Sequence, residues 1–183
     1  MMMRRCAAAA ALCLSLAACG SKPTVDETNA SVEDVSQAVR EASGEEGLLR
    51  PGKWQSSVTI EKMSVPGMPP EAAERMQSAM QQPRTAEACL TEEQAKEPGA
   101  NFFAGNDNCR YDHFRMKGGK IDAQMRCASG AATQVMKMAG TYSSTSYDMR
   151  MESDTTGGEA GQAMTMTMRV ESRRTGDCDE KAS

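Results

Sequence analysis

The chain has 183 residues, with 25 acidic against 21 basic side chains, a formal net charge of −4, one histidine and 4% aromatic residues. This length provides one modest domain. The totals exclude a zinc site built on histidines, a basic nucleic-acid-binding protein, a multidomain enzyme and a polytopic membrane protein.

The N-terminus has the pattern of an export signal. Arg4 and Arg5 precede an apolar run over residues 6–16, which is too short to span a bilayer and is followed by small residues. The tetrad Leu-Ala-Ala-Cys that ends at Cys19 resembles the lipobox of bacterial lipoproteins. This resemblance implies that the signal peptide is residues 1–18 and that Cys19 is acylated, with palmitate-type chains anchoring the protein in a membrane. An ordinary secretory peptide cleaved near Ala18 is the alternative.

The lipobox also implies a location. A lipid-anchored protein of the cell envelope faces the periplasm, and Gly20 in place of Asp after the lipidated cysteine favours the outer membrane over the inner one by enterobacterial sorting rules. Residues 19–47 are polar, acidic and free of aromatic side chains, so we expect a flexible spacer between the lipid and the domain. Within it, residues 31–42 have the pattern of a short helix capped by Ser31.

The domain is expected to begin at residue 48 with a half-buried strand over residues 52–63, where apolar and polar side chains alternate. A helix that begins at Glu71 and ends at Gln82 has an apolar stripe, which makes it the best candidate to cover a sheet. Residues 84–90 have the pattern of a short strand. Thr91 and Gln94 then resemble a capping box that opens one or two helical turns.

Two hairpins follow, each with a turn that sets its register. Gly118-Gly119 is a strong two-residue turn between strands over residues 109–117 and 120–127. On the apolar side this register pairs Met116 with Ile121 and Phe114 with Ala123, and on the polar side it pairs Arg115 with Asp122 and His113 with Gln124. The second turn, Ser144-Thr145, pairs Tyr142 with Tyr147, Met138 with Met151, and Lys137 with Glu152.

A last alternating strand covers residues 164–170, and residues 179–183 form a polar tail. The predicted fold is therefore mainly β: an antiparallel meander of about seven strands over residues 48–178, curled or covered by one amphipathic helix.

Four cysteines remain after the signal and the lipobox: Cys89, Cys109, Cys127 and Cys178. An even number in an exported chain, with no CxxC spacing, predicts two disulfides rather than a metal or redox site. Three pairings are open. The hairpin register places Cys109 on the polar face and Cys127 on the apolar face, which favours Cys89 with Cys109 and Cys127 with Cys178.

Several short motifs in this order resemble a bacterial exported family known as domain of unknown function 3617. They are the stretch Leu49-Arg50-Pro51-Gly52-Lys53-Trp54, the stretch Pro66-Gly67-Met68-Pro69-Pro70 before a Met-rich helix, and Cys89-Leu90-Thr91 followed by three more spaced cysteines. The resemblance covers about residues 48–178. It implies a periplasmic or envelope location and supplies no activity, substrate, cofactor or catalytic residue.

The chain is rich in methionine, with sixteen in all, and the predicted strands place seven of them on one face. These are Met136, Met138, Met149, Met151, Met164, Met166 and Met168. Methionines in strand alternation are typical of a packed core, and Cu(I) binding by their soft thioethers is an alternative. Adaptable methionines lining a cavity are also compatible with a carrier of an apolar small molecule.

No sequence motif points to catalysis. GxSxG, SxxK and HExxH are absent, and His113, the only histidine, is predicted to face solvent. We therefore expect a non-enzymatic protein without a cofactor, most simply an interaction or structural module of the envelope. Its expected partners are the membrane, reached through Cys19, and an envelope protein or apolar ligand, but not nucleic acid.

Overall fold

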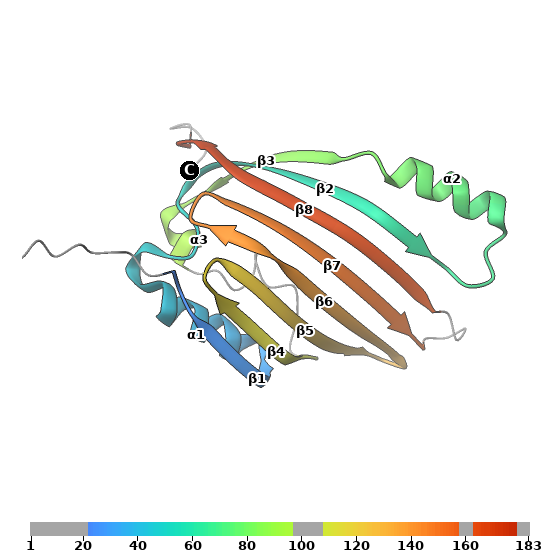
Figure 1. Cartoon of the computed structure of the whole chain (residues 1–183), viewed down its shortest axis with the longest axis horizontal. Coiled ribbons are helices and arrows are strands. Elements are labelled where there is room, and N and C mark those ends of the chain that lie inside the picture. Colours follow the sequence, from blue (N-terminus) through green and yellow to red (C-terminus); the bar gives the residue numbers. More distant parts are fainter. Residues whose placement is uncertain (1–21, 97–107, 158–162, 179–183) are drawn as a thin grey trace, which may run out of the picture.

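The computed structural model describes residues 22–96, 108–157 and 163–178, and its strands form one antiparallel sheet in the order β1-β4-β5-β6-β7-β8-β2-β3 (Figure 1). The mainly β antiparallel fold is confirmed, with eight strands in place of about seven. The strands are β1 Val25–Ser31, β2 Gly52–Ser64, β3 Arg84–Leu90, β4 Cys109–Lys117, β5 Lys120–Ser129, β6 Ala132–Ser143, β7 Ser146–Thr156 and β8 Met164–Gly176.

Both predicted hairpins are present in the predicted register. Gly118 and Gly119 have φ of 62° and 81°, the left-handed conformation that a tight two-residue turn needs at both positions. All seven predicted cross-strand pairs of β4–β5 and β6–β7 are observed. The pairing of β8 with β2 joins the end of the domain to its beginning.

The structure corrects the predicted flexible spacer at the N-terminus. Residues 25–43 form β1 and the helix α1 (Val32–Ser43), followed by the short 3-10 helix η1 (Gly44–Glu46). Val35 and Val39 of α1 are fully buried in the same cluster as the β4 side chains. A capping box fixes the start of α1: Ser31 Oγ accepts from the backbone N–H of Asp34, and the Asp34 carboxylate accepts from the N–H of Ser31. The helix pattern was therefore right, but the spacer reading was wrong, because burial of a valine stripe outweighs a polar composition.

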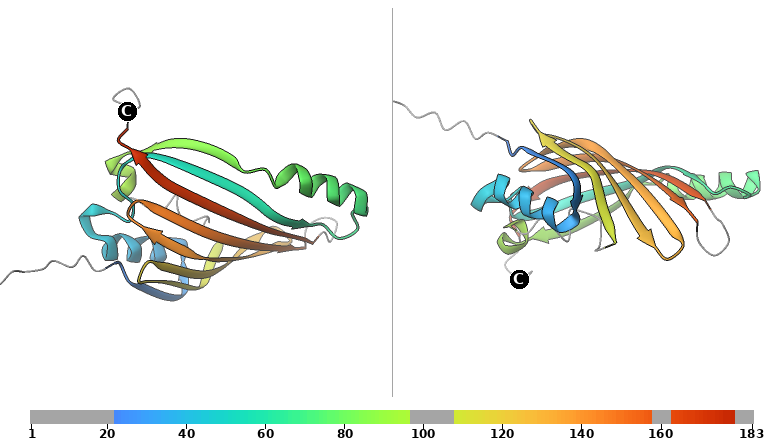
Figure 2. Two further views of the ribbon diagram at one scale, coloured as in Figure 1. Left: turned by 45° about the horizontal axis from the view of Figure 1, so that its top comes forward. Right: turned by 90° about the horizontal axis from the view of Figure 1, so that it is seen from below.

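The helix that covers the sheet is α1, not the predicted one. The predicted helix exists as α2 (Pro70–Met80), but none of its residues is buried. In the right panel of Figure 2, α1 lies on one side of the sheet, whereas α2 projects beyond the ends of the strands. The short helix α3 (Glu92–Lys96) begins with the predicted Thr91–Gln94 capping box.

The disulfide pairing is a second correction. Cys109 and Cys127 face each other on β4 and β5 and are bonded, with Cα atoms 4.0 Å apart. The register shifts at Asp112, which has no partner on β5 and forms a β-bulge. Because of this one-residue shift, the side chains of β4 that precede Asp112 lie on the opposite face from the one predicted. Cys109 therefore lies on the same face as Cys127.

The other disulfide joins Cys89 on β3 to Cys178, with Cα atoms 5.6 Å apart. Lys53 of β2 pairs with Cys89 on one side and with Gly176 of β8 on the other. Cys178 therefore reaches across the end of β2 and ties the edge strand β3 to the end of β8. The predicted bonds from Cys89 to Cys109 and from Cys127 to Cys178 are both wrong.

Candidate functional site

One face of the sheet is apolar across five adjacent strands, and we call it the methionine face. The strand register arranges it in three rows that run from β5 to β2. The rows are Ile121–Gly140–Met149–Val170–Val58, Ala123–Met138–Met151–Met168–Ile60 and Met125–Met136–Ser153–Met166–Met63. None of these fifteen residues is charged. The methionine face therefore differs from a sheet face that is exposed to solvent, which carries polar and charged side chains.

Burial differs between the two ends of this face. Near β4, against which α1 packs, Tyr111, Phe114, Met116 and Met125 are at most 1% exposed. On β8 and β2 the apolar side chains of the three rows are only half-buried, and we call this part the open half. Its members are Val58, Ile60, Met63, Met166, Met168 and Val170. In the open half, all six of these side chains keep part of their surface in solvent, whereas buried and half-buried side chains are mixed on β6 and β7.

The backbone makes room for the middle of this face at one glycine. A Cβ on Gly140 would lie 2.1 Å from the Asp148 carbonyl oxygen and 2.6 Å from Met149 Sδ. Gly140 stands opposite Met149, whose side chain is buried. The missing side chain at residue 140 thus leaves the space that Met149 occupies.

The structure brings most of the predicted methionines together. Met138, Met151 and Met168 stand directly opposite one another on β6, β7 and β8. Met138 and Met149 are buried, Met136 and Met151 pack against the core, and the three methionines of β8, Met164, Met166 and Met168, are half-buried. Cu(I) binding at these thioethers stays an untested prediction. In the described ranges, no group of three or more His, Cys, Asp and Glu residues could hold a metal ion.

A buried tyrosine lies at the covered end of the methionine face. Tyr111 is 0% exposed, stands edge-on to Phe114 with ring centroids 5.5 Å apart, and faces Met125 on β5. Its hydroxyl has no hydrogen-bond partner among the described residues, and burial raises its pKa to about 12. Strict alternation along β4 would have placed Tyr111 on the polar face. The Asp112 bulge places Tyr111 on the apolar face instead. The only sequence signal for this change of face was a large aromatic residue at a position predicted to be polar.

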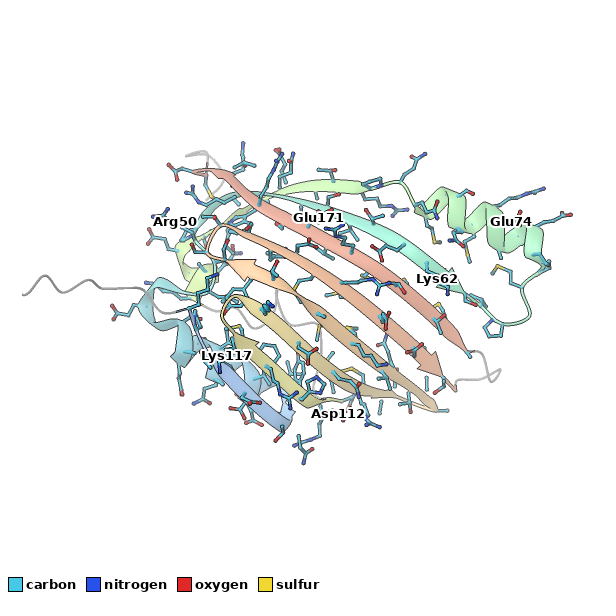
Figure 3. The ribbon with its side chains drawn as sticks, viewed as in Figure 1. Arg50, Lys62, Glu74, Asp112, Lys117 and Glu171 are labelled. Atoms are coloured by element: carbon cyan, nitrogen blue, oxygen red, sulfur yellow. A yellow bond between two sulfur atoms is a disulfide. The ribbon has the colours of Figure 1, made fainter. Side chains whose placement is uncertain are left out.

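The opposite face of the sheet is charged and shallowly hollowed. Arg169 donates to both carboxylate oxygens of Asp148, at 2.9 and 2.6 Å, and these bonds lower the pKa of Asp148. A hollow of about 480 Å³ lies on this face, and Figure 3 labels Glu171 of β8 among its side chains. Its lining residues are Gln55, Ser57, Thr85, Thr141, Ser146, Tyr147, Asp148, Glu171, Ser172 and Arg173.

The single histidine also lies on the charged face. His113 pairs with Gln124 across the strands as predicted, and its Nε2 lies 2.9 Å from Asp122 Oδ1. A second, smaller hollow of about 290 Å³ contains both residues together with Lys137, Arg150 and Glu152. No serine, threonine or cysteine lines this hollow, so the His113–Asp122 pair has no hydroxyl or thiol beside it among the lining residues.

Some predicted features lie outside the described residues. These are the signal peptide over residues 1–18, the lipidation residue Cys19, and the tail over residues 179–183. In the described ranges, no helix has the length and apolar composition needed to cross a bilayer.

These features define a class: a disulfide-linked protein built on one antiparallel sheet, with an apolar face that one helix covers in part and a charged face opposite. A family model described as "protein of unknown function (DUF3617)" matches residues 49–178. The chain belongs to this family. The matched residues contain β2 to β8, whereas β1 and α1 precede them. No curated protein and no solved structure matches the chain.

Proposed function

We propose that this protein is a lipid-anchored, non-catalytic binding protein of the bacterial envelope, and that its ligand is an apolar molecule held on the open half of the methionine face. The observation that carries the proposal is the contrast within the rows. The same uncharged rows that are buried on β5 continue, on β8 and β2, as half-buried side chains. A contiguous apolar patch that keeps part of its surface in solvent marks binding sites more often than inert surface.

The side chains of the open half suit a variable apolar guest. Met166 and Met168 are unbranched and polarisable, so they adapt to differently shaped ligands. Charged ligands are disfavoured, because the three rows offer no ion-pairing partner. Between the two hypotheses of an interaction module and a carrier of an apolar molecule, this surface favours the second.

The proposed anchor keeps the binding face near a membrane. Acylation at Cys19 would leave six peptide units before β1 begins at Val25, a span of at most about 20 Å. With β1 part of the sheet, the tether is much shorter than the predicted spacer. A source of apolar molecules would therefore lie within reach of the domain. Radiolabelled palmitate should label the wild-type chain and not the Cys19→Ser variant; equal labelling would exclude this anchor.

The binding proposal can be tested with the single tryptophan as an internal donor. Trp54 lies on β2, is buried and stacks on Tyr147 with ring centroids 6.1 Å apart. The test uses the mature chain with Cys19→Ser, which needs no detergent, and the apolar fluorophore N-phenyl-1-naphthylamine. Bound fluorophore should quench Trp54 emission and emit by energy transfer.

A matched pair of variants locates the site. Met168→Glu places a charge on the open half and should weaken fluorophore binding at least tenfold. Thr165→Glu places the same charge on the other face of β8, at an exposed position, and should leave binding unchanged. Absence of energy transfer in the parent chain, or equal effects of the two variants, would reject the methionine face as the binding surface.

A further inference from the structure

The larger hollow on the charged face crosses several strands. Eight of its ten lining residues belong to two adjacent cross-strand rows, Thr141–Asp148–Glu171–Ser57–Thr85 from β6 to β3 and Ser146–Arg173–Gln55 from β7 to β2. With neighbouring strands about 4.8 Å apart, the first row spans roughly 19 Å. The hollow, of about 480 Å³, therefore has the form of a groove at right angles to the strands, and we call it the polar groove.

Four side chains of the polar groove carry polar groups that the fold does not use. Among the described residues, the hydroxyls of Ser57, Thr85 and Thr141 have no hydrogen-bond partner. Gln55 Oε1 accepts from Arg173 Nη2 at 3.0 Å, and the Gln55 amide nitrogen has no partner in the same ranges. All four side chains are exposed or half-buried, so a ligand in the groove reaches them directly.

The two carboxylates of the first row are oriented by one arginine beside the groove. Arg169 donates to both oxygens of Asp148, and its Nη2 lies 3.3 Å from Glu171 Oε1. A carboxylate has about four lone-pair sites, so each of the two keeps acceptor sites for a ligand. Bonds to a guanidinium also fix the geometry of a carboxylate. Asp148 and Glu171 therefore offer oriented acceptors to whatever lies in the groove.

The charges and donors of the polar groove restrict the chemistry of its ligand. Asp148 and Glu171 are balanced by Arg169 and Arg173, so the groove favours a ligand without net charge. Carboxylates only accept hydrogen bonds, a guanidinium only donates them, and Ser and Thr hydroxyls do both. Among ligand groups, an alcohol hydroxyl both donates and accepts, so it can pair with every one of these side chains.

The direction of the groove separates sugars from peptides. The strands β7, β8 and β2 each have a neighbouring strand on both sides, so their backbone groups are used within the sheet. A peptide that lies across them finds no open strand edge with which to pair its main chain. A chain of sugar rings needs no such edge, because it presents hydroxyls along its whole length.

We propose that the polar groove binds a neutral, linear oligosaccharide. Its hydroxyls donate to Asp148 and Glu171, accept from Arg173, and pair with the unused hydroxyls of the first row. This inference goes beyond the proposed function, since the groove lies on the opposite face of the sheet from the methionine face. The two ligands therefore bind independently.

The test is isothermal titration calorimetry of the mature chain with Cys19→Ser. The probes are cellotetraose, maltotetraose and tetra-N-acetylchitotetraose, which differ in linkage and substitution. At least one of them should bind, at least tenfold more tightly than its own monosaccharide and than tetragalacturonate, whose carboxylates would face Asp148 and Glu171. Binding of none of the three, or equal binding of pentaglycine or tetragalacturonate, would overturn the inference.

Two triple variants locate the binding site. The first removes the three unused hydroxyls of the groove and should weaken binding at least tenfold: Thr141→Val, Ser57→Ala and Thr85→Val. The second removes three hydroxyls from the same face outside the groove and should leave binding unchanged: Thr59→Val, Thr165→Val and Thr167→Val. Equal effects of the two variants would reject the groove as the site.

A measurement on the parent chain decides if the first triple variant does not fold. In ¹⁵N NMR spectra, the oligosaccharide that binds should shift the side-chain amide signals of Gln55, and N-phenyl-1-naphthylamine should not. Unchanged Gln55 signals at saturation would overturn the inference. If the fluorophore does not bind at all, the apolar site fails and the groove is judged by the oligosaccharide alone.

Discussion

The two halves of the methionine face have the same chemistry and different burial. The apolar side chains of β4 and β5 are almost completely removed from solvent, and α1 packs against β4 at this end. On β8 and β2, the same three rows continue with methionine, valine and isoleucine, but these side chains are half-buried. Burial, rather than residue type, separates a core from a candidate binding surface.

Each half also has its own disulfide. Cys109–Cys127 links neighbouring strands at the covered half, and Cys89–Cys178 ties the edge strand β3 to the end of β8 beside the open half. The sequence separation of the bonded cysteines differs greatly, 18 in the first bond and 89 in the second. The bond beside the open half is therefore the one that closes the longer loop.

The largest expected effect is the loss of stability when one or the other disulfide is removed. In the chain-entropy picture, Cys89→Ser with Cys178→Ser should lower the free energy of unfolding by about 4.5 kcal/mol, and Cys109→Ser with Cys127→Ser by about 3 kcal/mol. Urea unfolding of both double variants measures the difference. The reverse order would show that the covered half depends more on its cross-link than the open half does.

Two methionine-to-alanine substitutions, one in each half, test whether the two halves differ in packing. Met125→Ala should cost about 3 kcal/mol, because Met125 is 0% exposed and its removal leaves a cavity. Met168→Ala should cost about 1 kcal/mol, because part of that side chain is already in water. Urea unfolding with both disulfides intact gives both values. Equal losses would mean that the open half is as tightly packed as the covered half.

The covering helix can be loosened at its cap. Ser31→Ala removes the acceptor for the Asp34 N–H and should cost about 1 kcal/mol. Amide hydrogen exchange should accelerate in α1 and β4 and stay unchanged in β8. Thr91→Ala is the control, since it removes the equivalent cap of α3, a helix of five residues. Faster exchange in β8 upon Ser31→Ala would show that the two halves unfold as one unit.

The smallest effect concerns the charged face behind the open half. The pKa of Asp148 is lowered by its hydrogen bonds from Arg169. This pair therefore stabilises the fold above the unfolded-state pKa of Asp, near 3.8, and the contribution disappears as pH falls through the folded pKa. Both side chains are partly exposed, so the effect should stay below about 1 kcal/mol.

The measurement compares the parent chain with Asp148→Asn from about pH 6 to about pH 2. The variant should be less stable at the higher pH, and the difference should vanish at the lower one. Added salt at neutral pH should also reduce it. A difference that is constant across this range would assign the effect to packing rather than to charge.

Local patterns predicted much of this protein from its sequence. The Gly118-Gly119 turn fixed the β4–β5 register from Lys117 back to His113, because a two-residue turn leaves one alignment that matches apolar with apolar side chains. The second hairpin, β2, β3 and the Thr91–Gln94 cap followed from the same kind of local signal. The methionine face was visible as alternation, since side chains two residues apart in a strand share a face.

Other features depended on contacts between distant segments. The Asp112 bulge has only a weak marker in the sequence, the aromatic Tyr111 at an otherwise polar position, and it determined both the Cys109–Cys127 bond and the burial of Tyr111. Residues 25–43 have a polar composition, but α1, with its buried Val35 and Val39, packs against both the preceding β1 and β4, which comes much later in the chain. In the same way, the β8–β2 pairing decided which cysteines Cys89 and Cys178 would meet.

The amino-acid order alone therefore determined strand alternation, turn geometry and the helix caps, because each depends on residues within a few positions of one another. Tertiary structure decided which helix covers the sheet, which sulfur atoms meet and which half of an apolar face stays exposed. Those outcomes depend on long-range packing, where the burial of a few side chains outweighs local composition.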